Sequence, residues 1–227
     1  LKEIRRSLYQ ELAGRILPKI ERHRGDQRKR ALASLPGRRP HPATRRPELT
    51  VRVDKGTELQ LLGRDGVDIL ALPLSRANLH QLPQITRKLK GREGKVIWRL
   101  PFMIFDEEVS WYREAVAWLA EAGFMRFELS NISHFGILRG IADKNPEIST
   151  DYRLFSLNSV AMEEWRSLGA AAVALYIEDD AENMAKLLAV DTTLLRRVLL
   201  HCEVPAIISK IAIKSVKNDA PLLSDRG

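Results

Sequence analysis

Short apolar runs that alternate with helix-like stretches are the feature that most constrains the fold. Strands that are joined by helices pair in parallel through right-handed crossovers. Seven or eight such runs therefore predict an α/β fold, and a (β/α) TIM-barrel-like closure is the most economical one. A link of one residue between the last two runs is too short for a parallel crossover, so we expect the barrel to be incomplete or irregular. The expected strands are residues 50–54, 67–73, 95–101, 124–131, 152–158, 172–178, 197–204 and 206–214.

The stretches between the runs carry helix start and stop signals. In residues 106–123, Asp106 can cap the helix, Glu107 and Glu108 suit its positive start, and Gly123 can end it. Ser159 and Asp180 open two further stretches of the same design. A glycine precedes a strand-like run at residues 66, 123 and 169. The pattern thus predicts repeated strand–helix units from residue 48 to residue 227.

The first 47 residues have a different composition. Leu1, Ile4, Leu8, Leu12 and Ile16 recur at helical spacing and predict an amphipathic helix over the first 17 or so residues. Residues 22–47 are rich in arginine and contain four prolines, which is typical of a linker or flexible arm. We therefore expect two parts: a helix with a basic linker at 1–47 and a barrel-like domain at 48–227.

The positive charge of the chain lies in this first part. The formal net charge is +8, yet residues 1–46 hold 14 lysines and arginines against four acidic residues. The segment is either a solvated connector or an arm that contacts RNA or DNA, because phosphate contacts need only clustered basic side chains. The candidate nucleic-acid residues are Arg28, Lys29, Arg30, Arg38, Arg39, Arg45 and Arg46.

Several expected strands are polar in one of their two phases. Because alternate residues of a strand face opposite sides of a sheet, these polar residues should share the inner face of the barrel. A charge buried there needs a partner, and Arg99 among Glu128, Glu178 and Glu203 would satisfy that need. The polar phase comprises Lys95, Arg99, Glu128, Ser130, Ser156, Asn158, Tyr176, Glu178, His201 and Glu203.

Two interpretations of the polar phase remain open. It is either a structural polar layer or a site at the carboxyl ends of the strands, where parallel α/β folds bind their ligands. In the second case Glu128, Glu178 and His201 are the candidate catalytic acids and bases. Candidate binding residues are Arg99, Asn131, Asn158 and Glu203.

Cysteine and motif content exclude several kinds of site. Cys202 is the single cysteine, so a multi-cysteine metal site or an iron–sulfur cluster cannot form within this chain. We therefore expect no cofactor in it. The sequence contains no Gly-rich phosphate loop, no His-Glu-x-x-His zinc motif and no Gly-x-Ser-x-Gly elbow.

No apolar run approaches the length of a membrane span, and the presence of a single cysteine suits a reducing cytoplasm. His80 and His134 are expected to be surface or capping residues.

Three segments are distinctive when taken in order: "VIWRLPFMIFDEE", "STDYRLFSLNSVAMEEWRSLGAAAVALYIEDDAENMAKLL" and "VPAIISKIAIKSVKNDAPLLSDRG". Together they resemble the collagenase-like peptidase family U32. The opening "LKEIRRSLYQELAGRI" is similar to a helical connector of that family. The positions that match the family pattern are Asn158, Ser159, Gly169, Ser209, Lys210, Asp225 and Gly227.

The resemblance implies the following about function. The family is named for peptidase activity, while several relatives hydroxylate RNA or quinone precursors with an iron–sulfur cluster held by four cysteines. Cys202 alone cannot supply that cluster. The chain also lacks an initiating methionine, so we expect the C-terminal portion of a longer member, whose upstream domain would be its partner.

Three functions follow from these expectations. The first is an accessory or substrate-binding barrel-like domain, with no catalytic signature of its own. The second is a peptidase or other hydrolase with a carboxylate–histidine site at the barrel mouth. The third is an RNA-binding accessory module of an RNA-modifying hydroxylase.

Overall fold

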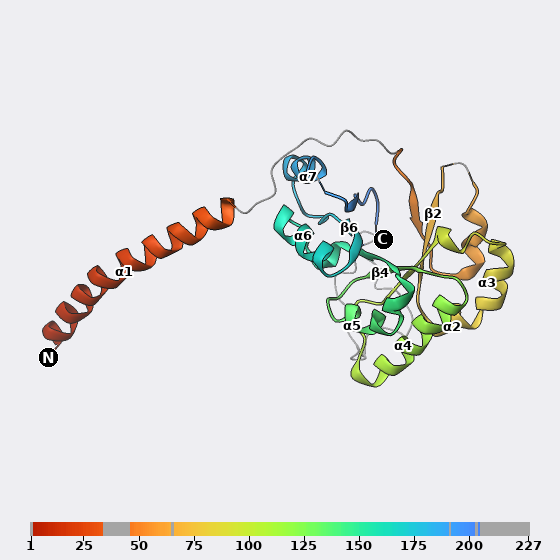
Figure 1. Cartoon of the computed structure of the whole chain (residues 1–227), viewed down its shortest axis with the longest axis horizontal. Coiled ribbons are helices and arrows are strands. Elements are labelled where there is room, and N and C mark those ends of the chain that lie inside the picture. Colours follow the sequence, from red (N-terminus) through yellow and green to blue (C-terminus); the bar gives the residue numbers. More distant parts are fainter. Residues whose placement is uncertain (1, 34–45, 65, 191, 203, 205–227) are drawn as a thin grey trace, which may run out of the picture.

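The computed structural model describes residues 2–33, 46–64, 66–190, 192–202 and 204. Its described part contains a sheet of seven strands, all parallel, in which each strand pairs with the next one along the chain. The sheet curls into a half-barrel with helices on its outside (Figure 1). This confirms the expected α/β, incomplete barrel-like fold. The strands are β1 Thr50–Arg52, β2 Ile69–Pro73, β3 Val96–Arg99, β4 Arg126–Leu129, β5 Glu147–Thr150, β6 Ala170–Ala174 and β7 Leu195–Arg197.

The connecting helices begin and end close to the expected signals. Asn158 and Asp180 cap two of them by accepting hydrogen bonds from backbone N–H groups, and Gly123 and Gly169 have φ values of +89° and +97° just before the following strand. Asp106 is the first residue of its helix and does not cap it. The helices are α2 Arg76–His80, α3 Leu82–Leu89, α4 Asp106–Glu121, α5 His134–Leu138, α6 Ser159–Ser167 and α7 Ala181–Leu188, with 3-10 turns η1 Gly56–Leu61, η2 Glu93–Lys95, η3 Arg139–Lys144 and η4 Tyr152–Leu154.

The main hydrophobic core lies between the sheet and the helices. Trp98 and Phe127, from the centres of β3 and β4, are fully buried there, as is Leu119 of α4. The Trp98 and Phe124 rings meet edge to face, with centroids 5.7 Å apart. Since the apolar phase of each strand faces the helices, the other phase is left for the inner face of the half-barrel.

Two expected strands are wrong. Of the expected strand 197–204, only Arg197 lies in a strand among the described residues, because β7 spans Leu195–Arg197. Residues 152–158 do not form a strand: residues 152–154 are the turn η4, and only Ser156 makes a bridge, with Leu175. The Asp151 carboxylate accepts a hydrogen bond from Tyr152 N at 2.7 Å and so starts the turn, and Phe155 then adopts φ +52°. The fifth strand is Glu147–Thr150 instead. The last expected strand, 206–214, lies outside the described residues.

The N-terminal helix is longer than the sequence suggested. Helix α1 spans Lys2–Ala33, so the expectation that residues 22–33 resist regular structure is wrong. Nine of the twelve residues in that stretch are arginine, lysine, glutamine, alanine or leucine, which are good helix formers, and the first of the four prolines comes only at position 36. Figure 1 shows α1 apart from the half-barrel, and Leu12, Ile16 and Ile20 are exposed on it. A search of the described residues found no helix with the length and apolar character needed to cross a membrane.

Candidate functional site

Glu128 is the centre of a group of charged side chains on the inner face. Its Oε1 atom accepts a hydrogen bond from Nη2 of Arg52 on β1 at 3.1 Å and lies 3.6 Å from Nε of Arg99 on β3. Its Oε2 atom lies 3.7 Å from Nη1 of Arg197 on β7. Arg99 pairs with Glu128 in the sheet register, which places both side chains on the same face. The curl of the sheet brings β1 and β7 to the same carboxylate.

A second carboxylate, Asp151, follows β5 directly. Its Oδ1 atom accepts a hydrogen bond from the same Arg52 Nη2 at 3.0 Å, so one nitrogen joins Asp151 to Glu128. Its Oδ2 atom accepts from Arg153 Nη1 at 2.6 Å. We call this group the inner cluster: Arg52, Arg99, Glu128, Asp151, Arg153 and Arg197.

The two carboxylates are buried, whereas the arginines reach solvent. The side chains of Glu128 and Asp151 are 6% and 3% exposed, against 28% for Arg52 and 24% for Arg99. Burial raises the pKa of Glu128, the Asp151 charge raises it further, and the surrounding arginines oppose both effects. Burial lowers the pKa of Arg99 and of Arg197, but a guanidinium keeps its charge in proteins. The arginines of the cluster therefore place permanent positive charges around the buried carboxyl group of Glu128.

Aromatic rings stand next to the inner cluster. The Arg153 guanidinium lies over the rings of Tyr152 and Phe102, at 4.7 and 5.6 Å from their centroids. Phe155 packs on Tyr176 with centroids 5.0 Å apart and is 55% exposed. A positive φ is unfavourable for a bulky residue such as Phe155. The Tyr152 and Phe102 rings therefore help to hold Arg153 in place. Phe155, two residues further along the chain, remains an exposed aromatic side chain.

The predicted acid–base residues come together only in part. Arg99 and Glu128 meet as expected. Glu178 does not join them: β6 ends at Ala174, and Glu178 lies exposed in the following turn, where it accepts a hydrogen bond from the Tyr176 hydroxyl at 3.0 Å. His201 is exposed beyond the end of β7, and Glu203 lies outside the described residues. The two-residue alternation does not continue past the strand ends, so it could not place Glu178 and His201.

Two predicted binding residues close local turns. The Asn131 side-chain oxygen accepts hydrogen bonds from Ser133 N and Oγ, both at 3.0 Å, and its amide donates to Phe102 O at 3.4 Å. The Asn158 side chain caps α6 by accepting from Ala161 N at 2.8 Å. Each has a structural role that accounts for its position.

The candidate nucleic-acid residues lie partly within the described residues. Arg28, Lys29 and Arg30 are exposed on α1, and Arg46 is exposed before β1. Outside the described residues lie Arg38, Arg39 and Arg45.

Sequence reasoning missed four members of the inner cluster. Arg52 alternates with the apolar Val51 and Val53, so the two-residue period of β1 could have revealed it. Arg197 could have been found in the same way if β7 had been placed at its actual position. Asp151 and Arg153 gave no such signal, because they lie beyond the true end of β5.

His134 is another correction. It was expected on the surface or at a cap, but it is fully buried at the start of α5, where Nδ1 accepts a hydrogen bond from Ser130 N at 3.4 Å. Burial lowers its pKa to about 4, so it is neutral at physiological pH. His80 is exposed, as expected. Within the described ranges, no three His, Cys, Asp or Glu side chains are grouped so that they could hold a metal ion.

Comparisons with known proteins gave one structural likeness. The chain is similar to a protein described as "The Structure of the U32 Peptidase Mk0906", with a TM-score of 0.51 and 12% sequence identity over 71% of this chain and 73% of that one. No family model and no curated protein matched the sequence. The likeness concerns the fold, and it agrees with the incomplete barrel expected from the alternation of strands and helices.

Proposed function

We propose that the chain is a substrate-binding, accessory barrel-like domain of a U32-type protein and that its inner face is the binding site. The observation that supports this most is the inner cluster, which gathers side chains from four sheet elements at the carboxyl ends of parallel strands. That end of an α/β sheet is where ligands bind. The shared fold of a U32 peptidase supports the assignment to this kind of protein.

The chemistry of the inner cluster favours binding over catalysis. Arginine neither gives up nor accepts a proton at neutral pH, so it suits the recognition of a charged group and not general acid–base work. Glu128 and Asp151 both contact arginine, which holds each in an ion pair. Glu178 and His201, the other candidate catalytic groups, make no contact with Glu128 among the described residues. The chemistry would then reside in another part of the polypeptide, which is the expected partner of this domain.

The proposal predicts that the purified chain does not hydrolyse proteins. Gelatin and casein, incubated with the chain, should be cleaved at the rate of a buffer control, because the inner cluster offers no nucleophile with an adjacent base. The release of soluble peptides measures this. The variants Glu128→Gln and Glu178→Gln should give the same result as the unaltered chain.

Robust cleavage that disappears in Glu128→Gln or Glu178→Gln would overturn the accessory role. It would establish instead the alternative of a hydrolase with a carboxylate site at the barrel mouth. Cleavage that persists in both variants would point to a contaminating protease, and a second purification step would remove it.

An RNA-binding role for the N-terminal part is a second candidate, and the charge of α1 favours it. Its described residues hold ten lysines and arginines against four acidic residues, and the basic side chains from residue 22 to residue 30 are exposed. Clustered positive charge binds phosphates without regard to sequence, and each phosphate that is neutralised releases a counterion. We propose that any RNA contact is made there and not by the half-barrel.

Fluorescence anisotropy with a structured RNA tests this second candidate. We expect binding that weakens about tenfold or more between 50 and 200 mM salt and that is lost when residues 1–46 are deleted. Exchanging Arg28, Lys29 and Arg30 for glutamine in the full chain should weaken binding in part, while Arg113→Gln on α4 should leave it unchanged. If the truncated chain binds RNA as tightly as the full chain, the basic segment is only a connector.

A further inference from the structure

The inner cluster has more positive than negative charge. Four guanidinium groups contact two carboxylates. Arg126 and Glu147, whose charges also act on Arg197, form an ion pair of their own at 2.6 Å and add no net charge. Asp54 acts on Arg99 only at longer range. Removing charges from water is unfavourable unless opposite charge compensates them. Among the described residues, the inner cluster thus has an excess of two guanidinium charges, which indicates that an anion completes it.

Two of the arginines have guanidinium N–H groups that donate no hydrogen bond to a described residue. Arg99 donates no side-chain hydrogen bond to any described residue, because its Nε lies 3.6 Å from Glu128, beyond hydrogen-bonding reach. Arg197 Nη1 is buried without a hydrogen-bond partner and lies 3.7 Å from the same carboxylate. A buried donor that is left without a partner is destabilising. Arg52 and Arg153, by contrast, use their guanidinium groups to hold Glu128 and Asp151 in place.

The surroundings of these two arginines leave them accessible. Arg99 and Arg197 have side chains that are 24% and 19% exposed. Ala174 pairs with Arg197 in the sheet register, and Pro73 pairs with Arg99 on the side opposite Glu128, so neither of these two neighbours is large. A planar guanidinium presents two parallel N–H groups, a geometry that matches the oxygens of a carboxylate or a phosphate.

We infer that Arg99 and Arg197 bind a substrate oxyanion, a carboxylate or phosphate group, on the inner face, with Glu128 and Arg52 as the groups that position them. This inference rests on the proposed function and deepens it by naming the ligand chemistry. Binding supplies hydrogen-bond acceptors to the unused donors and compensates the excess charge.

Equilibrium dialysis of the full chain with radiolabelled inorganic phosphate and, separately, with radiolabelled succinate tests the inference. Arg99→Gln and Arg197→Gln should each weaken the binding of the preferred anion by about tenfold or more, since each removes a charge-assisted contact. Arg99→Lys keeps the charge but loses the planar fork, so its binding should be intermediate. Binding of phosphate alone assigns a phosphate-bearing substrate, and binding of succinate alone assigns a carboxylate.

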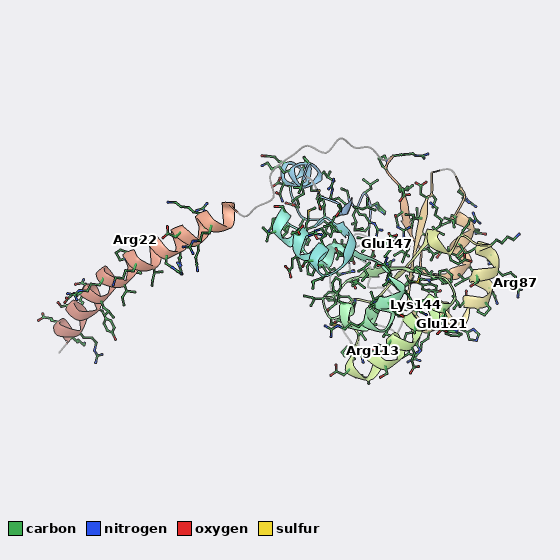
Figure 2. All side chains as sticks on the ribbon, in the orientation of Figure 1. Arg22, Arg87, Arg113, Glu121, Lys144 and Glu147 are labelled. Atoms are coloured by element: carbon green, nitrogen blue, oxygen red, sulfur yellow. The ribbon has the colours of Figure 1, made fainter. Side chains whose placement is uncertain are left out.

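Two matched controls separate the inner cluster from other basic surfaces. Arg87→Gln on α3 and Arg113→Gln on α4 remove the same charge from exposed positions that Figure 2 labels, and each should change the affinity by less than about twofold. Circular dichroism and thermal unfolding establish that every variant is folded. A variant that does not fold is replaced by the corresponding lysine variant, which keeps the ion pair to Glu128.

Failure of this inference differs from failure of the proposed function. If neither anion binds at millimolar concentration, or if Arg99→Gln and Arg197→Gln bind as tightly as the unaltered chain, the oxyanion site is refuted. The accessory role would still stand in that case, because the proteolysis assay decides it. Conversely, a chain that hydrolyses casein could still bind an oxyanion through these arginines.

Discussion

Replacing Arg52 by methionine should lower the free energy of unfolding by about 3 kcal/mol. The substitution keeps an unbranched, flexible side chain but removes the cation that joins Glu128 to Asp151, and it leaves two buried carboxylates close together. Removal of one partner of a buried ion pair is strongly destabilising, and the lower end of the usual range applies because Arg52 is itself 28% exposed. Urea unfolding at pH 7 measures the loss.

The loss in Arg52→Met should depend on pH. The folded-state pKa of Glu128 is already above its ordinary value, so the stability that this group contributes is present at low pH and is lost as the pH rises through that pKa. Without Arg52 the pKa rises further, so the difference between the variant and the unaltered chain should be small near pH 4 and largest at neutral pH. Adding Glu128→Gln should restore part of the stability. An equal loss at both pH values would show that the effect is not electrostatic, and Arg113→Met on α4 is the matched control.

Trp98→Ala should destabilise the half-barrel by about 3 to 5 kcal/mol. The indole is fully buried between β3 and the helices and packs edge to face on Phe124, so its removal leaves a large cavity. Trp98→Phe should cost less, because the ring contact remains and because the buried Nε1–H of Trp98 has no hydrogen-bond partner to lose.

Trp118→Ala is the matched control for this prediction. Trp118 lies on α4 and is 52% exposed, so its removal should cost less than about 1 kcal/mol. Chemical denaturation of the three variants gives the comparison. If Trp98→Ala and Trp118→Ala lose similar stability, the core between the sheet and the helices does not have the packing described for it.

The fold could be predicted from the sequence because its signals are local and repeated. Apolar runs, capping residues such as Asn158 and Asp180, and glycines such as Gly169 each act within a few residues. Errors arose where a tertiary or capping contact overrode the pattern. Residues 152–154 look like part of a strand but form a turn, because the Asp151 carboxylate accepts a hydrogen bond from Tyr152 N. The arginine-rich residues 22–33 resemble a linker but continue helix α1.

The candidate site was harder to predict, because charge pairing depends on how the sheet curls. The two-residue alternation could place Arg99 and Glu128 on one face, and their pairing is confirmed. It carries no information on which distant strands approach that face, so it could not show that Arg52 and Arg197 meet at Glu128. The two-residue alternation does not apply beyond the strand ends. The prediction that Glu178 and His201 lie on the inner face was therefore wrong.

The order of the strands has a consequence for folding. Each strand pairs with its neighbour in the chain, so the sheet can grow one unit at a time, and each added pair closes a shorter loop than a pairing of distant strands would. The inner cluster is the exception, because Arg52 and its two carboxylate partners are separated by 76 and 99 residues. Closing such long loops costs entropy that short-range pairing avoids. We therefore expect the ion pairs of the cluster to form after most of the sheet, so that a partly folded chain lacks the inner cluster.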